Sequence, residues 1–163
     1  MRQPVKLTVE GAPAKEAVLK NHPTKKEMGE RKLAAVNTFW IPGADADALI
    51  VTELFRLKEL YNVTVTSKNA DGLVGKYEAD EGIAAKKIQW VPVESAVACK
   101  VKKAGDLLDE KGAYRADSLS EEAGYCEPSC RELADSAVVQ FERYGYARLD
   151  KKEEHGLVFI FSC

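Results

Sequence analysis

The chain has 163 residues, of which 45% are hydrophobic, and its 24 Lys and Arg against 26 Asp and Glu give a net charge of −2. That length and apolar content suffice for one ordinary domain or two small ones without disulfide staples. The slightly negative charge excludes a uniformly basic nucleic-acid-binding surface, so any RNA contact has to come from local patches.

The first third of the chain predicts short strands separated by polar loops. Residues 4–10 (PVKLTVE) alternate apolar and polar side chains, which is typical of a half-buried strand. Residues 21–31 (NHPTKKEMGER) form a polar loop, and residues 33–41 (LAAVNTFWI) predict one continuous strand. A short helix follows, for which Asp45 or Asp47 would supply the cap.

The middle of the chain continues in the same way. Residues 53–67 are strand-like in their second half, with a strong turn signal at Asn69, Asp71 and Gly72. Residues 87–93 (KIQWVPV) and the alternating Val97, Cys99 and Val101 predict further strands.

The last third ends in a predicted hairpin. Residues 114–124 are acidic and serine-rich, which favours an exposed loop, and residues 127–135 predict a short helix with Pro128 in its first turn. Residues 138–150 and 157–163 form the two hairpin strands around a polar loop. Many short strands without βαβ alternation predict an all-β fold of barrels or a sandwich.

No local pattern indicates catalysis, a metal or a membrane. Nucleophile-elbow, phosphate-loop and zinc-protease signatures are absent, as are a signal peptide and a long apolar run, which favours a cytoplasmic protein. Cys126 and Cys130 differ in spacing from a zinc ribbon, and no histidine is near them in sequence, so partly buried thiols are expected rather than a metal site.

Three groups of segments resemble the anticodon-binding C-terminal region of class I glutamyl- and glutaminyl-tRNA synthetases of the archaeal type. They are PVKLTVEGAP with NHPTKKEMGER, FRLKELYNVTV with KIQWVPVESAV, and GYCEPSCREL with VVQFERYGYARLD. The resemblance implies two tandem β-barrels, 1–88 and 89–163, and leaves open whether the terminal strands return to the first barrel. It implies no cofactor in this chain, because the segments that handle ATP and Mg²⁺ belong to a catalytic domain absent from these residues.

The resemblance also implies which side chains contact RNA. The family's base-reading Gln and Arg fall on Gln140 and Arg143, and its basic strand residues near the wobble base fall on Arg56 and Lys58. An amide and a guanidinium suit base edges, since both offer directed hydrogen bonds. Plausible backbone contacts in the HP-containing loop are Lys25, Lys26 and Arg31.

The expected partner is tRNA(Glu), with no DNA or membrane, and several alternatives stay open. Asp47 and Ala48 stand where glutamine enzymes carry a Lys-Arg pair for the third anticodon base, which favours tRNA(Glu) over tRNA(Gln). A glutaminyl enzyme, a ribosomal-type RNA-binding barrel and a docking module for other synthetases or an amidotransferase are the alternatives. Trp40 and Trp90 are expected in the core, whereas Tyr144 and Tyr146 are left open between packing and base stacking.

Overall fold

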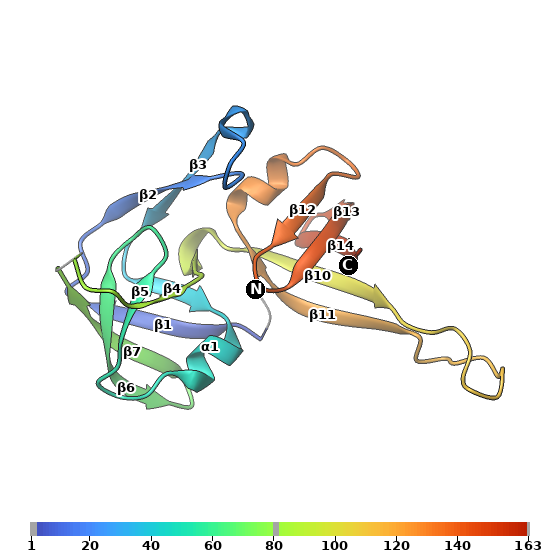
Figure 1. The fold of residues 1–163 in the computed structure, drawn as a ribbon, viewed down its shortest axis with the longest axis horizontal. Coiled ribbons are helices and arrows are strands. Elements are labelled where there is room, and N and C mark those ends of the chain that lie inside the picture. Colours follow the sequence, from blue (N-terminus) through green and yellow to red (C-terminus); the bar gives the residue numbers. More distant parts are fainter. Residues whose placement is uncertain (1–2, 80–81, 163) are drawn as a thin grey trace. The chain divides into compact units, whose positions relative to one another are not determined.

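The computed structural model describes residues 3–79 and 82–162. The chain forms two compact units, the N-unit (Gln3–Ala96) and the C-unit (from Val97 onward), each with its own hydrophobic core. Strands dominate both units and the helices are short (Figure 1), which confirms the predicted all-β fold class. The predicted domain boundary after residue 88 stays a prediction. Among the described residues, no helix is long and apolar enough to cross a membrane.

The N-unit contains a seven-stranded sheet with the strand order β8-β5-β6-β7-β1-β4-β9. These strands are β1 (Val5–Glu10), β4 (Thr38–Ile41), β5 (Leu54–Leu57), β6 (Asn62–Asn69), β7 (Gly72–Glu78), β8 (Lys86–Ile88) and β9 (Val91–Pro92). A separate hairpin pairs β2 (Lys15–Lys20) with β3 (Glu30–Ala35), and its loop contains the 3-10 turn η1 (Lys26–Met28). Helix α1 (Gly43–Ala48) follows β4, and the 3-10 turn η2 (Val93–Ser95) follows β9.

The core of the N-unit explains why apolar and polar side chains alternate along its strands. Inward-facing residues of β1, β4, β5 and β6 are fully buried, and an edge-to-face series of rings joins Trp90, Phe39, Tyr61 and Tyr77. Neighbouring ring centroids in this series lie 5.2 to 6.3 Å apart, which is the favourable range for such pairs. The expected core position of Trp90 is confirmed, whereas Trp40 is only half-buried.

Two local predictions in the N-unit were wrong. Residues 33–41 are not one strand, because β3 pairs with β2 whereas β4 pairs with β1, and the chain changes partner at Val36 and Asn37. The predicted helix is present as α1, but its N-cap is Pro42 and no side chain caps it. Asp45 lies inside the helix instead, where its buried carboxylate pairs with Lys86 at 3.1 Å.

The C-unit contains a five-stranded sheet in the order β11-β10-β14-β13-β12. Its elements are β10 (Val97–Ala104), β11 (Leu119–Cys126), the 3-10 turn η3 (Pro128–Glu132), β12 (Val138–Phe141), β13 (Gly145–Glu153) and β14 (Gly156–Phe161). In Figure 1, β10 and β11 lead out to a long loop, residues 105–118, which extends away from the rest of this sheet. Pro128 begins η3, so the predicted short helix is confirmed as a 3-10 turn.

Two predictions in the C-unit were also wrong. The acidic segment 114–124, expected to be a loop, overlaps β11, which pairs with β10 along its whole length from Leu119 to Cys126. The acidic side chains are accommodated because this edge strand is largely exposed and Glu121 lies opposite Lys102, with which it forms an ion pair at 3.6 Å. The predicted strand 138–150 is split by a turn into β12 and β13.

The two units share one feature of strand pairing. In each unit the first strand pairs in parallel with the second strand of a later hairpin, β1 with β7 and β10 with β14. Each of these later strands begins with glycine at a close approach. A Cβ atom on Gly72 would lie 2.2 Å from the Lys6 carbonyl oxygen, and one on Gly156 would lie 2.6 Å from that of Ala98. These positions therefore require glycine.

Candidate nucleic-acid interface

Arg56 and Lys58 lie at the end of β5 in the N-unit. Phe55 and Leu57 are fully buried, so the intervening Arg56 side chain points to the other face of the sheet, where it is partly exposed. Its guanidinium donates a hydrogen bond to the Oδ1 atom of Asn62 at 3.1 Å. This bond orients the guanidinium and leaves other N–H groups of the fork for an acceptor such as a base edge or a phosphate.

The backbone of Lys58 is held from both sides. Its N–H donates to the carbonyl of Ile88 at 3.0 Å, and its own carbonyl accepts a 2.9 Å bond from the indole Nε1–H of Trp90. The next residue, Glu59, has a positive φ of 57°, and the turn closes with a bond from Leu57 N–H to the carbonyl of Tyr61. The buried tryptophan thus fixes the turn that carries Lys58.

Lys25, Lys26 and Arg31 surround the loop of the β2–β3 hairpin. Lys25 and Lys26 are exposed, while Arg31 is partly buried and donates to the Lys20 carbonyl at 2.7 Å. The ring Nδ1 of His22 accepts bonds from the backbone N–H groups of Thr24, at 3.2 Å, and Lys25, at 3.0 Å. Arg31 therefore braces the hairpin, and the loop presents the two lysines to solvent together with Glu27 and Glu30.

Gln140 and Arg143 lie on either side of the end of β12 in the C-unit. Gln140 pairs with Tyr146 of β13 and its side chain is exposed, whereas its neighbours Val139 and Phe141 pack toward the core. Arg143 is also exposed, and it occupies the left-handed backbone region with φ 60°. Glu142 lies in this turn too, rather than inside a strand as the sequence suggested.

Tyr144 and Tyr146 have different environments. Tyr146 is 45% exposed on the sheet surface. Tyr144 is half-buried against the core of the C-unit, and its hydroxyl donates to the Oε2 atom of Glu122 at 2.8 Å. The glycine between them, Gly145, would suggest a bulge from its residue type, but the irregularity of β13 lies between Leu149 and Lys151. Of these two tyrosines, Tyr146 is the one whose side chain is open to solvent for stacking.

The structure therefore groups the predicted RNA-contacting residues into separate sets. In the C-unit, Gln140 lies near the end of β12 and Arg143 in the turn that follows, and in the N-unit Arg56 and Lys58 lie at one strand end. Sequence reasoning missed the residues that support these sets. Asn62 and Trp90 contact Arg56 and Lys58 from another strand or loop, and Glu122 on β11 contacts Tyr144, the neighbour of Arg143.

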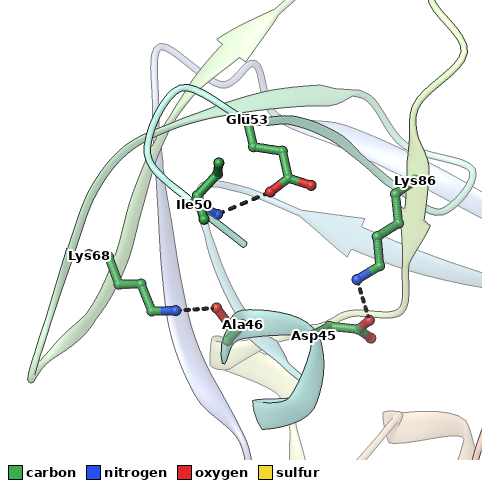
Figure 2. A network of polar contacts seen from close by, with 6 residues as sticks. All are labelled: Asp45, Ala46, Ile50, Glu53, Lys68 and Lys86. Carbon is green, nitrogen blue, oxygen red and sulfur yellow. Dashed lines mark hydrogen bonds and ion pairs between the residues drawn. The ribbon is translucent and has the colours of Figure 1, made fainter. Parts of the chain in front are cut away.

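The end of α1 is an acidic and apolar surface. Asp47 and Ala48 are both exposed there. The carbonyl groups at this helix end are occupied by Lys68, whose ammonium donates to Ala46 at 2.8 Å, Asp47 at 2.9 Å and Leu49 at 3.3 Å. Figure 2 shows the first of these bonds together with the Lys86–Asp45 pair. Lys68 thus has a structural role, and Asp47 presents an exposed carboxylate.

The thiols of the C-unit lie in its core. Cys99 and Cys126 are buried, Cys130 is half-buried, and none of the three forms a disulfide. Hydrogen bonding with Cys130 and then Cys99, together with burial, raises the pKa of the Cys126 thiol far above its usual range, so it stays protonated. Within the part of the chain that the structure describes, no three Cys, His, Asp or Glu residues form a group suited to a metal ion. Cys163 lies outside the described residues.

Comparison with known proteins identifies relatives across nearly the whole chain. Residues 1–80 and residues 87–150 each match the family described as tRNA synthetases class I (E and Q), anti-codon binding domain. A glutamate–tRNA ligase of Methanocaldococcus jannaschii is 32% identical over 98% of this chain and 27% of its own length. A ligase of the same name from Methanoculleus marisnigri is 34% identical over 92% of the chain and 24% of its own length. The chain thus spans about a quarter of the length of these curated relatives.

Proposed function

We propose that this chain, which belongs to the family of anticodon-binding domains of class I tRNA synthetases (E and Q), binds the anticodon loop of tRNA(Glu). The observation that carries the proposal is the exposed pair Gln140, near the end of β12, and Arg143, in the turn that follows, both within residues 87–150 that match the family. Its relatives are named glutamate–tRNA ligases, which supports glutamate over glutamine as the amino acid of the cognate tRNA.

The chemistry of the exposed groups fits unstacked loop bases. Sequence-specific RNA recognition usually targets single-stranded loops, because splayed bases expose edges and faces that a helical stem hides. The amide of Gln140 offers both a donor and an acceptor, and the guanidinium of Arg143 can fork onto a base edge or stack on its face. We assign base contacts to this pair and to Arg56 and Lys58.

Lys25 and Lys26 are assigned to the phosphate backbone. Both are exposed on the β2–β3 loop, and ammonium groups on a flexible stem neutralise phosphates without reading sequence. Arg31 has a smaller part in this assignment, because its guanidinium is engaged with the Lys20 carbonyl.

The ligase reaction belongs to the longer protein in this proposal. Attachment of glutamate to tRNA, with ATP and Mg²⁺, would be carried out in the cytoplasm by a catalytic domain outside these 163 residues. The chain alone would then bind tRNA without activating glutamate.

The central test is replacement of Arg143 by alanine. We expect Arg143→Ala to weaken binding of a glutamate anticodon stem-loop by roughly 5- to 100-fold, the range of one good base contact, and binding of a stem closed by an unrelated tetraloop much less. Fluorescence anisotropy at a fixed salt concentration would measure both affinities. Arg131→Ala is the matched control, because Arg131 is an exposed arginine of the same unit and lies in η3.

Equal losses for the two RNAs would contradict base reading by Arg143 and leave it as a phosphate contact. A second comparison uses stem-loops that differ only at the third anticodon base, which distinguishes glutamate from glutamine tRNA. Tighter binding of the glutamine stem-loop would contradict the proposed cognate tRNA.

A further inference from the structure

The turn that carries Arg143 needs support from outside itself. Its two ends, Phe141 and Gly145, are paired in the β12–β13 ladder, and a 2.9 Å bond joins the Tyr144 N–H to the Phe141 carbonyl. Arg143 holds a φ of 60° and Gly145 a φ of 135°, and a non-glycine residue in the left-handed region costs about 1 kcal/mol or more. A strained turn persists only when the surrounding structure fixes it.

Tyr144 provides the first part of that support. Its ring packs edge-to-face on Phe161, with centroids 5.7 Å apart, and on Phe141 at 6.3 Å. Its hydroxyl reaches across the sheet to Glu122 on β11, at 2.8 Å. The residue after Arg143 is therefore held both by packing and by a directed hydrogen bond to a carboxylate, which is stronger than a neutral one.

Lys103 of β10 provides the second part. Its ammonium lies 4.6 Å from the ring centroid of Tyr144 and 4.4 Å from that of Phe161, and 3.7 Å from a carboxylate oxygen of Glu122. The side chains of Lys103 and Glu122 are 29% and 23% exposed, so water screens this pair less than it screens a surface ion pair. Cation, phenol and carboxylate thus form one polar cluster.

We propose that Tyr144, Glu122 and Lys103 are positioning residues, which fix the direction in which Arg143 is presented to the anticodon loop. They touch no RNA themselves in this assignment. The inference rests on the proposed function of Arg143 and adds that the contribution of Arg143 to binding depends on a cluster built from two strands, β10 and β11, and the turn itself. When a side chain is misplaced by about 1 Å, a directed contact can lose a large part of its contribution to the binding free energy.

The same contacts could serve stability alone, and a double-mutant cycle separates the two roles. The full chain and the variants Tyr144→Ala, Arg143→Ala and the double variant are each titrated with the glutamate anticodon stem-loop. We expect Tyr144→Ala to weaken binding by about tenfold in the Arg143 background and by less than about twofold once Arg143 is absent, which is strong coupling. A purely structural residue would give the same factor in both backgrounds.

Two further variants keep the test valid if Tyr144→Ala fails to fold. Tyr144→Phe keeps the ring and removes only the bond to Glu122, and Lys103→Met keeps an apolar stem and removes the charge. We expect both variants to weaken binding less than Tyr144→Ala does, and we expect their effects to depend on Arg143 in the same way. Leu133→Ala is the control, because Leu133 packs on the same core without belonging to the cluster, and its effect on binding should not depend on Arg143.

The outcomes are distinguishable. If Arg143→Ala weakens stem-loop binding but Tyr144→Ala and Tyr144→Phe act additively with it, the positioning role is refuted and the proposed function stands. If Arg143→Ala leaves stem-loop binding unchanged, the proposed function of Arg143 fails and the positioning role fails with it.

Discussion

Replacement of Lys68 by methionine tests how the end of α1 is stabilised. The last carbonyl groups of a helix have no partner within it, and α1 has only six residues, so an external donor matters more here than in a long helix. Lys68 on β6 supplies all three of its N–H donors to the carbonyls of Ala46, Asp47 and Leu49. Methionine keeps the length of the stem and removes the donors.

The magnitude follows from these three bonds. At about 1 kcal/mol net for each, their loss is partly offset by about 1.5 kcal/mol of side-chain entropy that an ordered lysine gives up. We therefore expect Lys68→Met to lower the free energy of unfolding of the N-unit by about 1.5 kcal/mol. With a urea dependence of about 1 kcal/mol per molar, the midpoint would fall by about 1.5 M.

Tryptophan fluorescence in urea is the assay, because both tryptophans, Trp40 and Trp90, lie in the N-unit and report on it alone. Lys76→Met is the matched control, since Lys76 is an exposed lysine of the neighbouring strand β7. A midpoint shift for Lys68→Met no larger than that for Lys76→Met would refute the reasoning, because the three bonds would then contribute nothing net.

Two further predictions concern the N-unit. Tyr61→Phe should raise the free energy of unfolding by about 1 kcal/mol in urea at neutral pH, because the buried Tyr61 hydroxyl has no hydrogen-bond partner among the described residues. Burial raises the pKa of Tyr61 far above its usual range, so the wild type should lose stability as pH rises above about 10, where the unfolded phenol ionises, and Tyr61→Phe should lose less. An unchanged midpoint would contradict this. Gly72→Ala should lower the free energy of unfolding by at least about 3 kcal/mol, and Gly11→Ala by about 1 kcal/mol. Both glycines have a positive φ, but of the two only a Cβ atom on Gly72 would collide with backbone atoms. Equal losses for the two variants would contradict a steric origin.

Local patterns in the sequence predicted the strands whose partners are nearby in sequence. The alternation of Val5, Leu7 and Val9 and the turn before Gly72 suffice for β1 and for the β6–β7 hairpin. The change of strand partner at Asn37 was not predicted, because the buried Ala35 and Phe39 keep the same two-residue alternation on both sides of the break. Pairing with β10 makes the acidic β11 a strand, and no local propensity carries that information.

The candidate site shows the same division between local and distant information. The sequence motif points to Gln140 and Arg143, and the structure places both on the surface. The anchoring of the adjacent turn by Lys103 and Glu122 depends on β10 and β11, which lie far from it in the chain. The structural use of Trp90 as a donor to Lys58 is likewise a contact between segments 32 residues apart.

The parallel strand pairs that contain Gly72 and Gly156 also suggest an order of folding. β1 cannot pair with β7 until most of the N-unit has been synthesised, and β10 cannot pair with β14 until most of the C-unit has been synthesised. Hairpins such as β6–β7 and β13–β14 need only short loops and form first, since contacts distant in sequence form slowly. We therefore expect the opening strand of each unit to stay unpaired on one side until late in synthesis, and that edge is then open to wrong partners.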